Sequence, residues 1–106
     1  GIFFHPKDLE IRRRLASDEV RRKYWRMTLE GYLLLCKAQP SLGRVALARM
    51  VRAGRLPLLV TQNTDGLHLK AGHDPGGIVE LHGTSHVCAC VTCGGKFPRL
   101  SVQERV

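Results

Sequence analysis

Residues 57 to 61, PLLVT, form a short apolar run between a helix-like segment and a polar loop. A run of this length without polar interruption is typical of a strand that is buried on both faces of a parallel sheet. The helical pattern before it and the polar segment TQNTDG after it therefore indicate an α/β unit. In open sheets of this kind, ligands bind beyond the carboxyl ends of the strands. The sequence thus predicts a ligand site at residues 61 to 66, at the end of a central parallel strand.

Two helices are expected before this strand. Ser17 is a suitable N-cap for a helix over about residues 18 to 37, and the Gln39-Pro pair ends it. Ser41 can cap a second helix, which Gly54 ends. The residues that recur at helical spacing in the first helix are Val20, Tyr24, Met27, Gly31 and Leu34. The residues of the second helix that we expect to face a core are Leu42, Val45, Ala46, Met50 and Val51.

The segments after residue 72 have simpler patterns. The segment HDPGG has the residues that are typical of a turn, and IVELHG is a second candidate strand that ends in His82. The alternating segment SHVCAC predicts an extended arm. The fold class is therefore α/β.

The chain has 106 residues and a formal charge of +8, and 13 of its 17 Lys and Arg lie in residues 1 to 56. This excess could bind a phosphate backbone. However, the charges of residues 11 to 26 alternate with apolar residues, as on the solvated face of an amphipathic helix, so we expect no nucleic-acid partner. No apolar run of membrane-spanning length, secretory signal core or transit-peptide composition is visible, which favours a reducing compartment for the four cysteines.

Cys90 and Cys93 form the motif CVTCGG. Two thiolates at this spacing are typical of one half of a tetrahedral zinc site, although redox pairs share the spacing. We favour zinc, because Gly94 and Gly95 follow rather than a helix. His86 and Cys88 lie nearby, but an extended arm would place His82 about 26 Å from Cys90, so His82 cannot share the metal.

Several polar residues near the two predicted strands could carry chemistry. His82 at a strand end could act as a general base, or it could be a hydrogen-bonded histidine at the edge of a core. Gln62, Asn63 and Asp65 could bind hydroxyl and carboxamide groups, or they could form an Asx-rich turn. Taken singly, each of these patterns leaves both interpretations open.

Together, the ordered motifs TQNTDGLH, ELHG and CVTC resemble the sirtuins, the NAD-dependent protein lysine deacylases, and in detail their class II branch. The resemblance runs from about RRKYWR to the end of the chain, some 85 residues. It implies part of a Rossmann-like parallel-sheet domain, joined to the first half of a small zinc-binding module that begins at about residue 86 and extends to residue 106.

The resemblance also implies residue roles. His82 matches the catalytic base, which helps to deprotonate a ribose hydroxyl after the acyl oxygen has attacked the sugar and expelled nicotinamide. Gln62, Asn63, Thr64 and Asp65 match the residues that line the nicotinamide and ribose pocket, although Thr64 stands where a branched aliphatic residue is usual. The implied substrate is an acyl-lysine protein or peptide.

Cys90 and Cys93 match two of four ligands of a structural zinc. The glycine-rich loop that cradles the phosphates of NAD and the second cysteine pair have no counterpart in these residues, and Arg44 replaces a usual histidine. We therefore expect residues 1 to 106 to be a partial catalytic domain, inactive alone, from the cytoplasm or the mitochondrial matrix. ADP-ribosyl transfer is a related activity, and the alternative function is a small basic zinc-stabilised binding module without catalysis.

Overall fold

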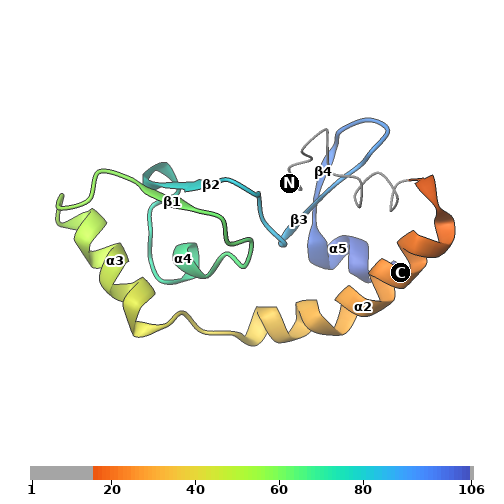
Figure 1. Ribbon diagram of the computed structural model, residues 1–106, viewed down its shortest axis with the longest axis horizontal. Coiled ribbons are helices and arrows are strands. Elements are labelled where there is room, and N and C mark those ends of the chain that lie inside the picture. The colour runs from red at the N-terminus through yellow and green to blue at the C-terminus, as the bar shows by residue number, and fades with distance from the viewer. Residues whose placement is uncertain (1–15, 106) are drawn as a thin grey trace.

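The computed structural model describes residues 16 to 105, and Figure 1 shows a long helix α2 along the lower right, below α5 and the strands β3 and β4. Helix α2 spans Asp18–Lys37, which confirms the predicted range. The Ser17 side chain accepts a hydrogen bond from the Val20 amide at 3.4 Å and so caps the helix as expected. The part of the basic run that precedes residue 16 lies outside the described residues.

Helix α3 spans Leu42–Arg52 and begins at the predicted cap, where Ser41 accepts from the Arg44 amide at 3.3 Å. It ends in a Schellman motif: the Gly54 amide bonds the Val51 carbonyl and the next amide bonds the Met50 carbonyl. Gly54 has φ +73°, a left-handed conformation that glycine adopts without strain. The predicted end of the second helix is therefore confirmed.

Strands β1 (Leu59–Thr61) and β2 (Ile78–Glu80) form a two-stranded parallel sheet in which Thr61 is the partner of Glu80. The parallel arrangement of the two predicted strands is confirmed. The connection between them contains the short helix α4 (Leu67–Lys70) and a 3-10 turn (Pro75–Gly77). The strand begins two residues later than predicted, because proline at position 57 fixes its own φ and lacks an amide hydrogen.

The prediction that this strand is buried on both faces is wrong for the described part of the chain. Val60 and its register partner Val79 are 53% and 40% exposed, whereas Leu59 and Thr61 are half-buried and buried. Successive side chains of a strand point to opposite faces. The face of the sheet that carries Leu59 and Thr61 therefore packs against other described residues. The face that carries Val60 and Val79 is not covered by residues 16 to 105.

The predicted extended arm is an antiparallel hairpin. Strands β3 (Val87–Ala89) and β4 (Lys96–Pro98) pair, and helix α5 (Arg99–Gln103) follows at once. The sequence predicted neither β4 nor α5. In Figure 1 the hairpin and α5 lie at one end of the molecule, and α3, α4 and the parallel sheet lie at the other.

Arg99 joins α5 to helix α2. Its side chain is only 6% exposed, and its guanidinium carbon lies 4.4 Å from the Trp25 ring centroid and 5.2 Å from that of Tyr32. Its Nη2 donates to the Thr28 hydroxyl at 2.9 Å. The inward face of α2 is therefore the row that contains Trp25, Thr28 and Tyr32.

The residues of α2 that recur at helical spacing do not form its inward face, because Met27 and Leu34 are 67% and 70% exposed. Those side chains follow the helical period but lie on the side away from Arg99. In α3, Ala48 is fully buried, while the predicted core residue Leu42 is 89% exposed. Within residues 16 to 105, no helix is both long and apolar enough to cross a membrane.

Candidate functional site

The parallel register brings the two polar segments to one edge of the sheet. Gln62 and Asn63 follow β1 directly, and His82 follows β2 by two residues. The Leu81 amide donates to the Thr61 carbonyl at 2.9 Å, which extends the contact between the segments one residue past the end of β2. The residues predicted to bind a ligand therefore lie on the edge where open parallel sheets bind ligands.

His82 lies in a turn rather than at the last position of the strand, which ends at Glu80. The turn is closed by the Gly83 amide, which donates to the Glu80 carbonyl at 3.1 Å, and Gly83 has φ +74°. The His82 side chain is exposed. Its imidazole is thus accessible at this edge and is not packed into the core of the described residues.

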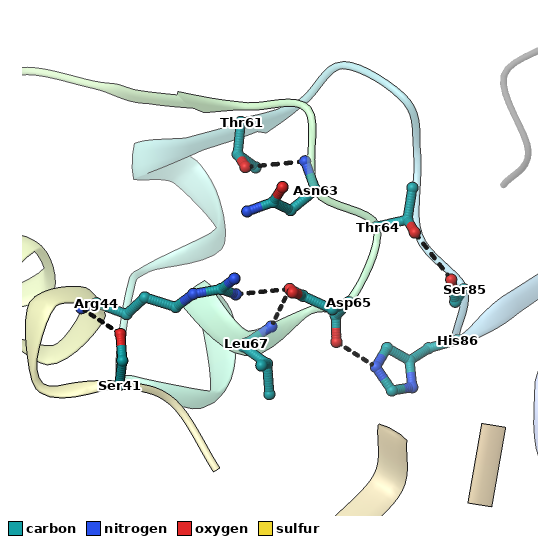
Figure 2. A network of polar contacts seen from close by, with 9 residues as sticks. All are labelled: Ser41, Arg44, Thr61, Asn63, Thr64, Asp65, Leu67, Ser85 and His86. Atoms are coloured by element: carbon teal, nitrogen blue, oxygen red, sulfur yellow. Dashed lines mark hydrogen bonds and ion pairs between the residues drawn. The ribbon is translucent and has the colours of Figure 1, made fainter. Parts of the chain in front are cut away.

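The loop that follows β1 is fixed by local hydrogen bonds (Figure 2). The Thr61 hydroxyl accepts from the Asn63 amide at 3.1 Å, which holds the backbone at the start of the loop. The side chains of Gln62 and Asn63 are exposed. Their carboxamide groups can therefore donate to and accept from a ligand while the backbone beneath them stays fixed.

Asp65 is bound within the chain. Its Oδ1 accepts from Arg44 Nη1 at 2.7 Å and from the Leu67 amide at 3.0 Å, so it joins α3 to the start of α4 (Figure 2). The hydrogen bond from Arg44 lowers the pKa of Asp65, and the Leu67 amide adds to this effect against the opposing effect of burial. The sequence missed this pair, although Arg44 had been identified as unusual at its position.

Replacing Asp65 by Asn is expected to lower the free energy of unfolding by about 1 kcal/mol at pH 7, because a neutral amide keeps the geometry but loses the charge of the hydrogen bond. A carboxylate whose pKa is lowered by folding stabilises the protein above its unfolded pKa of about 3.9. That contribution is lost as the pH falls through the lower folded pKa. The difference between the two proteins in urea unfolding should therefore begin to shrink below about pH 4 and vanish only below the folded pKa of Asp65.

Asp74→Asn is the matched control, because Asp74 accepts from the Gly76 amide at 3.1 Å in a turn that asparagine can also form. This substitution should change stability by less than about 0.5 kcal/mol. Equal losses in the two variants would contradict the importance of the Arg44 ion pair.

The segment that follows His82 is bonded to the same loop. The Ser85 amide donates to the Thr64 carbonyl at 2.8 Å, and the Ser85 hydroxyl lies 3.0 Å from the Thr64 hydroxyl. His86 Nε2 lies 2.9 Å from the Asp65 carbonyl oxygen, and its Nδ1 lies 2.9 Å from the Tyr32 hydroxyl. Both ring nitrogens of His86 are thus occupied, which argues against this residue as a zinc ligand.

Gly66 is required at its position for two reasons. It has φ +68°, and a Cβ atom there would lie 2.8 Å and 2.9 Å from Cδ2 and Nε2 of His86. Gly54 has a similar φ of +73° but open space around the position of a Cβ. Comparing the same substitution at Gly66 and Gly54 therefore distinguishes the effect of backbone strain from the effect of contact with the His86 ring.

Gly66→Ala is expected to cost about 1 to 3 kcal/mol more than Gly54→Ala, because only the first adds overpacking to the left-handed strain. Urea unfolding of both variants measures the difference. Equal destabilisation by the two substitutions would show that the His86 ring does not press against Gly66.

Two histidines of the described region, one in α4 and one shortly after it, are buried. His68 and His73 are 8% and 5% exposed, and their rings meet edge to face with centroids 5.5 Å apart. Among the described residues, both nitrogens of His73 and Nδ1 of His68 have no hydrogen-bond partner. Burial is the main cause that lowers the pKa of His68, and the nearby positive charge of Arg44 lowers it further.

Cys90 and Cys93 lie in the tight turn between β3 and β4, at the end of the hairpin that is far from β2 (Figure 1). The Gly94 amide donates to the Cys90 carbonyl at 2.8 Å, and the Gly95 amide donates to Cys93 Sγ at 3.4 Å. The backbone amides of Cys93 and Thr92 lower the pKa of the Cys90 thiol. Among the described residues, no group of three or more potential ligands is arranged to hold a metal.

The fold and the polar edge place this chain among the α/β domains that bind ligands at the carboxyl ends of parallel strands. A sequence profile described as the Sir2 family matches residues 2–106. The chain therefore belongs to the Sir2 family, which confirms the sequence interpretation.

Curated relatives carry related names. The chain is 41% identical over 90 residues to the NAD-dependent protein deacylase SRT2 of Arabidopsis thaliana. The aligned residues cover 85% of the chain and 23% of the relative. It is 42% identical over 91 residues to the mitochondrial NAD-dependent protein lipoamidase sirtuin-4 of Bos taurus, which covers 86% of the chain and 28% of the relative. The chain thus spans about a quarter of the length of these relatives.

Solved structures share the fold. A mutant Sir2 with a p53 peptide and NAD has a TM-score of 0.79 and 30% identity, over 99% of this chain and 43% of that one. Sir2Tm bound to a propionylated peptide has a TM-score of 0.70 and 33% identity, over 76% of this chain and 33% of that one. The α/β fold class predicted from the sequence, part of a Rossmann-like parallel-sheet domain, is therefore confirmed.

Proposed function

We propose that this chain is the central part of an NAD-dependent protein lysine deacylase. The observation that carries the proposal is the parallel register of β1 and β2, because it sets the exposed His82 and the exposed Gln62 and Asn63 at one edge of the sheet. Relatives named deacylase and deacetylase, and neighbours bound to acylated peptides, support it.

The loop after β1 fits the polar parts of NAD. The carboxamides of Gln62 and Asn63 can pair with a carboxamide and with ribose hydroxyls, since each offers both donors and acceptors. Asp65 and Thr64 fix the loop through their bonds to Arg44 and Ser85. When bound, NAD would supply a ribose carbon that accepts the acyl oxygen as nicotinamide leaves.

His82 would act as the general base. Its imidazole is exposed on the same edge as the loop, and a neutral imidazole can take a proton from a ribose hydroxyl near neutral pH. His82 lies in a turn that is closed by the hydrogen bond from the Gly83 amide to the Glu80 carbonyl. This bond fixes the backbone that carries the imidazole.

Cys90 and Cys93 would supply two of the four thiolates of a structural zinc. Their turn fits this role, because the sulfurs of two cysteines with two residues between them receive backbone amide hydrogens in a tight turn. The hairpin that begins at Val87 supports a boundary near residue 86, after which the small zinc-binding module would begin. The zinc would stabilise this module and take no part in the reaction.

The substrate would be an acyl-lysine protein or peptide. Solved neighbours include Sir2 bound to an acetylated peptide. Cys36, Cys88, Cys90 and Cys93 are all free thiols, which suits a reducing compartment such as the cytoplasm or the mitochondrial matrix.

The proposal is tested in a complete Sir2 domain that carries this chain as its central segment. Release of nicotinamide should require both NAD and an acetyl-lysine peptide, and the peptide should lose its acetyl group in step with that release. Transfer of ADP-ribose to the protein would instead identify the related activity. A folded domain that does not bind NAD in a calorimetric titration would overturn the proposal.

A further inference from the structure

The His86 ring is held between two parts of the chain that are distant in sequence. Nε2 lies 2.9 Å from the Asp65 carbonyl oxygen, and Nδ1 lies 2.9 Å from the Tyr32 hydroxyl (the Asp65 contact is drawn in Figure 2). A carbonyl oxygen can only accept, so Nε2 must carry the hydrogen. In the neutral ring, Nδ1 then accepts from the hydroxyl of Tyr32.

Tyr32 is suited to hold the ring in this tautomer. It is 7% exposed, and burial, together with the nearby Cys36 thiol, raises its pKa to about 12. The hydroxyl therefore keeps its proton and can donate it to Nδ1. The two rings also meet edge to face, with centroids 5.5 Å apart.

The partner of Nε2 lies in the loop that carries the proposed NAD-binding residues. Asp65 is two residues after Asn63, and the neighbouring Thr64 is bonded twice to Ser85. The ring also fills the space beside Gly66 where a Cβ would otherwise lie. Residues 85 and 86 therefore hold residues 64 to 66 against helix α2.

We propose that His86 is a positioning residue for the NAD-binding loop, acting through its hydrogen bond to the Asp65 carbonyl. This inference rests on the proposed function. Helix α2 is a rigid element of 20 residues, and Tyr32 fixes the ring to it. The ring thus transmits the position of α2 to the loop, and through the loop to Gln62 and Asn63. His86 itself touches neither substrate in this proposal.

Two amide substitutions separate the two bonds of the ring. In His86→Gln, the side-chain nitrogen can reach about the position of Nε2 and donate to the Asp65 carbonyl. In His86→Asn, the shorter side chain reaches about the position of Nδ1 and can bond only Tyr32. Both variants remove the imidazole, so a difference between them reports the Asp65 bond.

The steady-state kinetics of both variants are measured in the complete Sir2 domain. His86→Asn is expected to raise KM for NAD about tenfold, the effect of losing one hydrogen bond of ordinary strength, with KM for the acetyl-lysine peptide changed less than about twofold. His86→Gln should stay within about threefold of the original protein in both constants.

Equal changes of both constants in two folded variants would overturn the inference, because they would show that His86 supports the fold as a whole and not the NAD-binding loop. Unchanged kinetics in His86→Asn would also overturn it while leaving the proposed function intact. An original domain that does not consume NAD would overturn the proposed function and this inference together. If His86→Asn does not fold, Tyr32→Phe replaces it, and this variant should raise KM for NAD about threefold by freeing the ring.

Discussion

Replacing His82 by alanine is expected to lower the deacylation rate at least about a hundredfold, which is the usual effect of losing a general base. The measurement is the rate of nicotinamide release and of peptide deacetylation by the complete Sir2 domain at saturating NAD and peptide. The exposed imidazole lies at the carboxyl end of β2, on the edge of the sheet that carries the proposed NAD-binding loop. Its removal takes away the group proposed to accept the ribose proton.

The stability of this variant serves as its control. The His82 side chain is exposed, so truncation should change the free energy of unfolding by less than about 0.5 kcal/mol. Calorimetric binding of NAD should also persist, because Gln62 and Asn63 remain in place. Near-normal turnover in the variant would remove His82 from the mechanism, and loss of soluble protein would instead make it a structural residue.

The helices could be predicted because their ends are encoded locally. Ser17 and Ser41 each bond an amide three residues ahead, and Gly54 adopts the left-handed conformation that ends α3. Which face of α2 turns inward is not encoded locally. That face is set by Arg99, which donates a hydrogen bond to Thr28 although the two residues are 71 positions apart in the sequence. A sequence pattern assigns such an arginine to solvent.

The hairpin and its following helix were missed for a similar reason. Phe97 and Leu100 are 48% and 50% exposed, so β4 and α5 bury little apolar surface and have no clear hydrophobic period. Strand β4 forms because its residues pair with β3, with Cys88 opposite Phe97. Pairing partners of this kind depend on the turn between them, which the sequence indicated only as a metal-binding motif.

The sequence identified residues of the candidate site but not the contacts that position them. His82, Gln62 and Asn63 stand where two strands end, and the order of helix, strand and polar loop is readable along the chain. The partners of Asp65 and His86 come from α3 and α2, at separations of 21 and 54 residues. For Asp65 the sequence left both a ligand contact and an Asx-rich turn open. The structure shows the bond to the Leu67 amide expected of such a turn, and it adds Arg44, a partner that the sequence did not predict.

Replacing Cys90 by serine is expected to release the proposed zinc, so that the metal content of the purified complete domain falls from about one ion per chain to almost none. A serine hydroxyl does not ionise near neutral pH, so the site would lose one of four anionic ligands. Since zinc binding contributes about 10 to 16 kcal/mol to the folding of small zinc modules, the hairpin should also unfold. Metal analysis after dialysis against a weak chelator measures the first effect, and protease cleavage between residues 87 and 98 measures the second.

Cys88→Ser is the matched control for this prediction. Cys88 lies in β3, where it pairs with Phe97, two residues before the turn that holds Cys90 and Cys93. Within the described residues, the amide contacts of the turn go to the sulfurs of Cys90 and Cys93 and not to that of Cys88. The control variant should therefore keep its zinc and its resistance to protease. Zinc retained by Cys90→Ser, or lost equally from both variants, would show that the turn between β3 and β4 is not half of a zinc site.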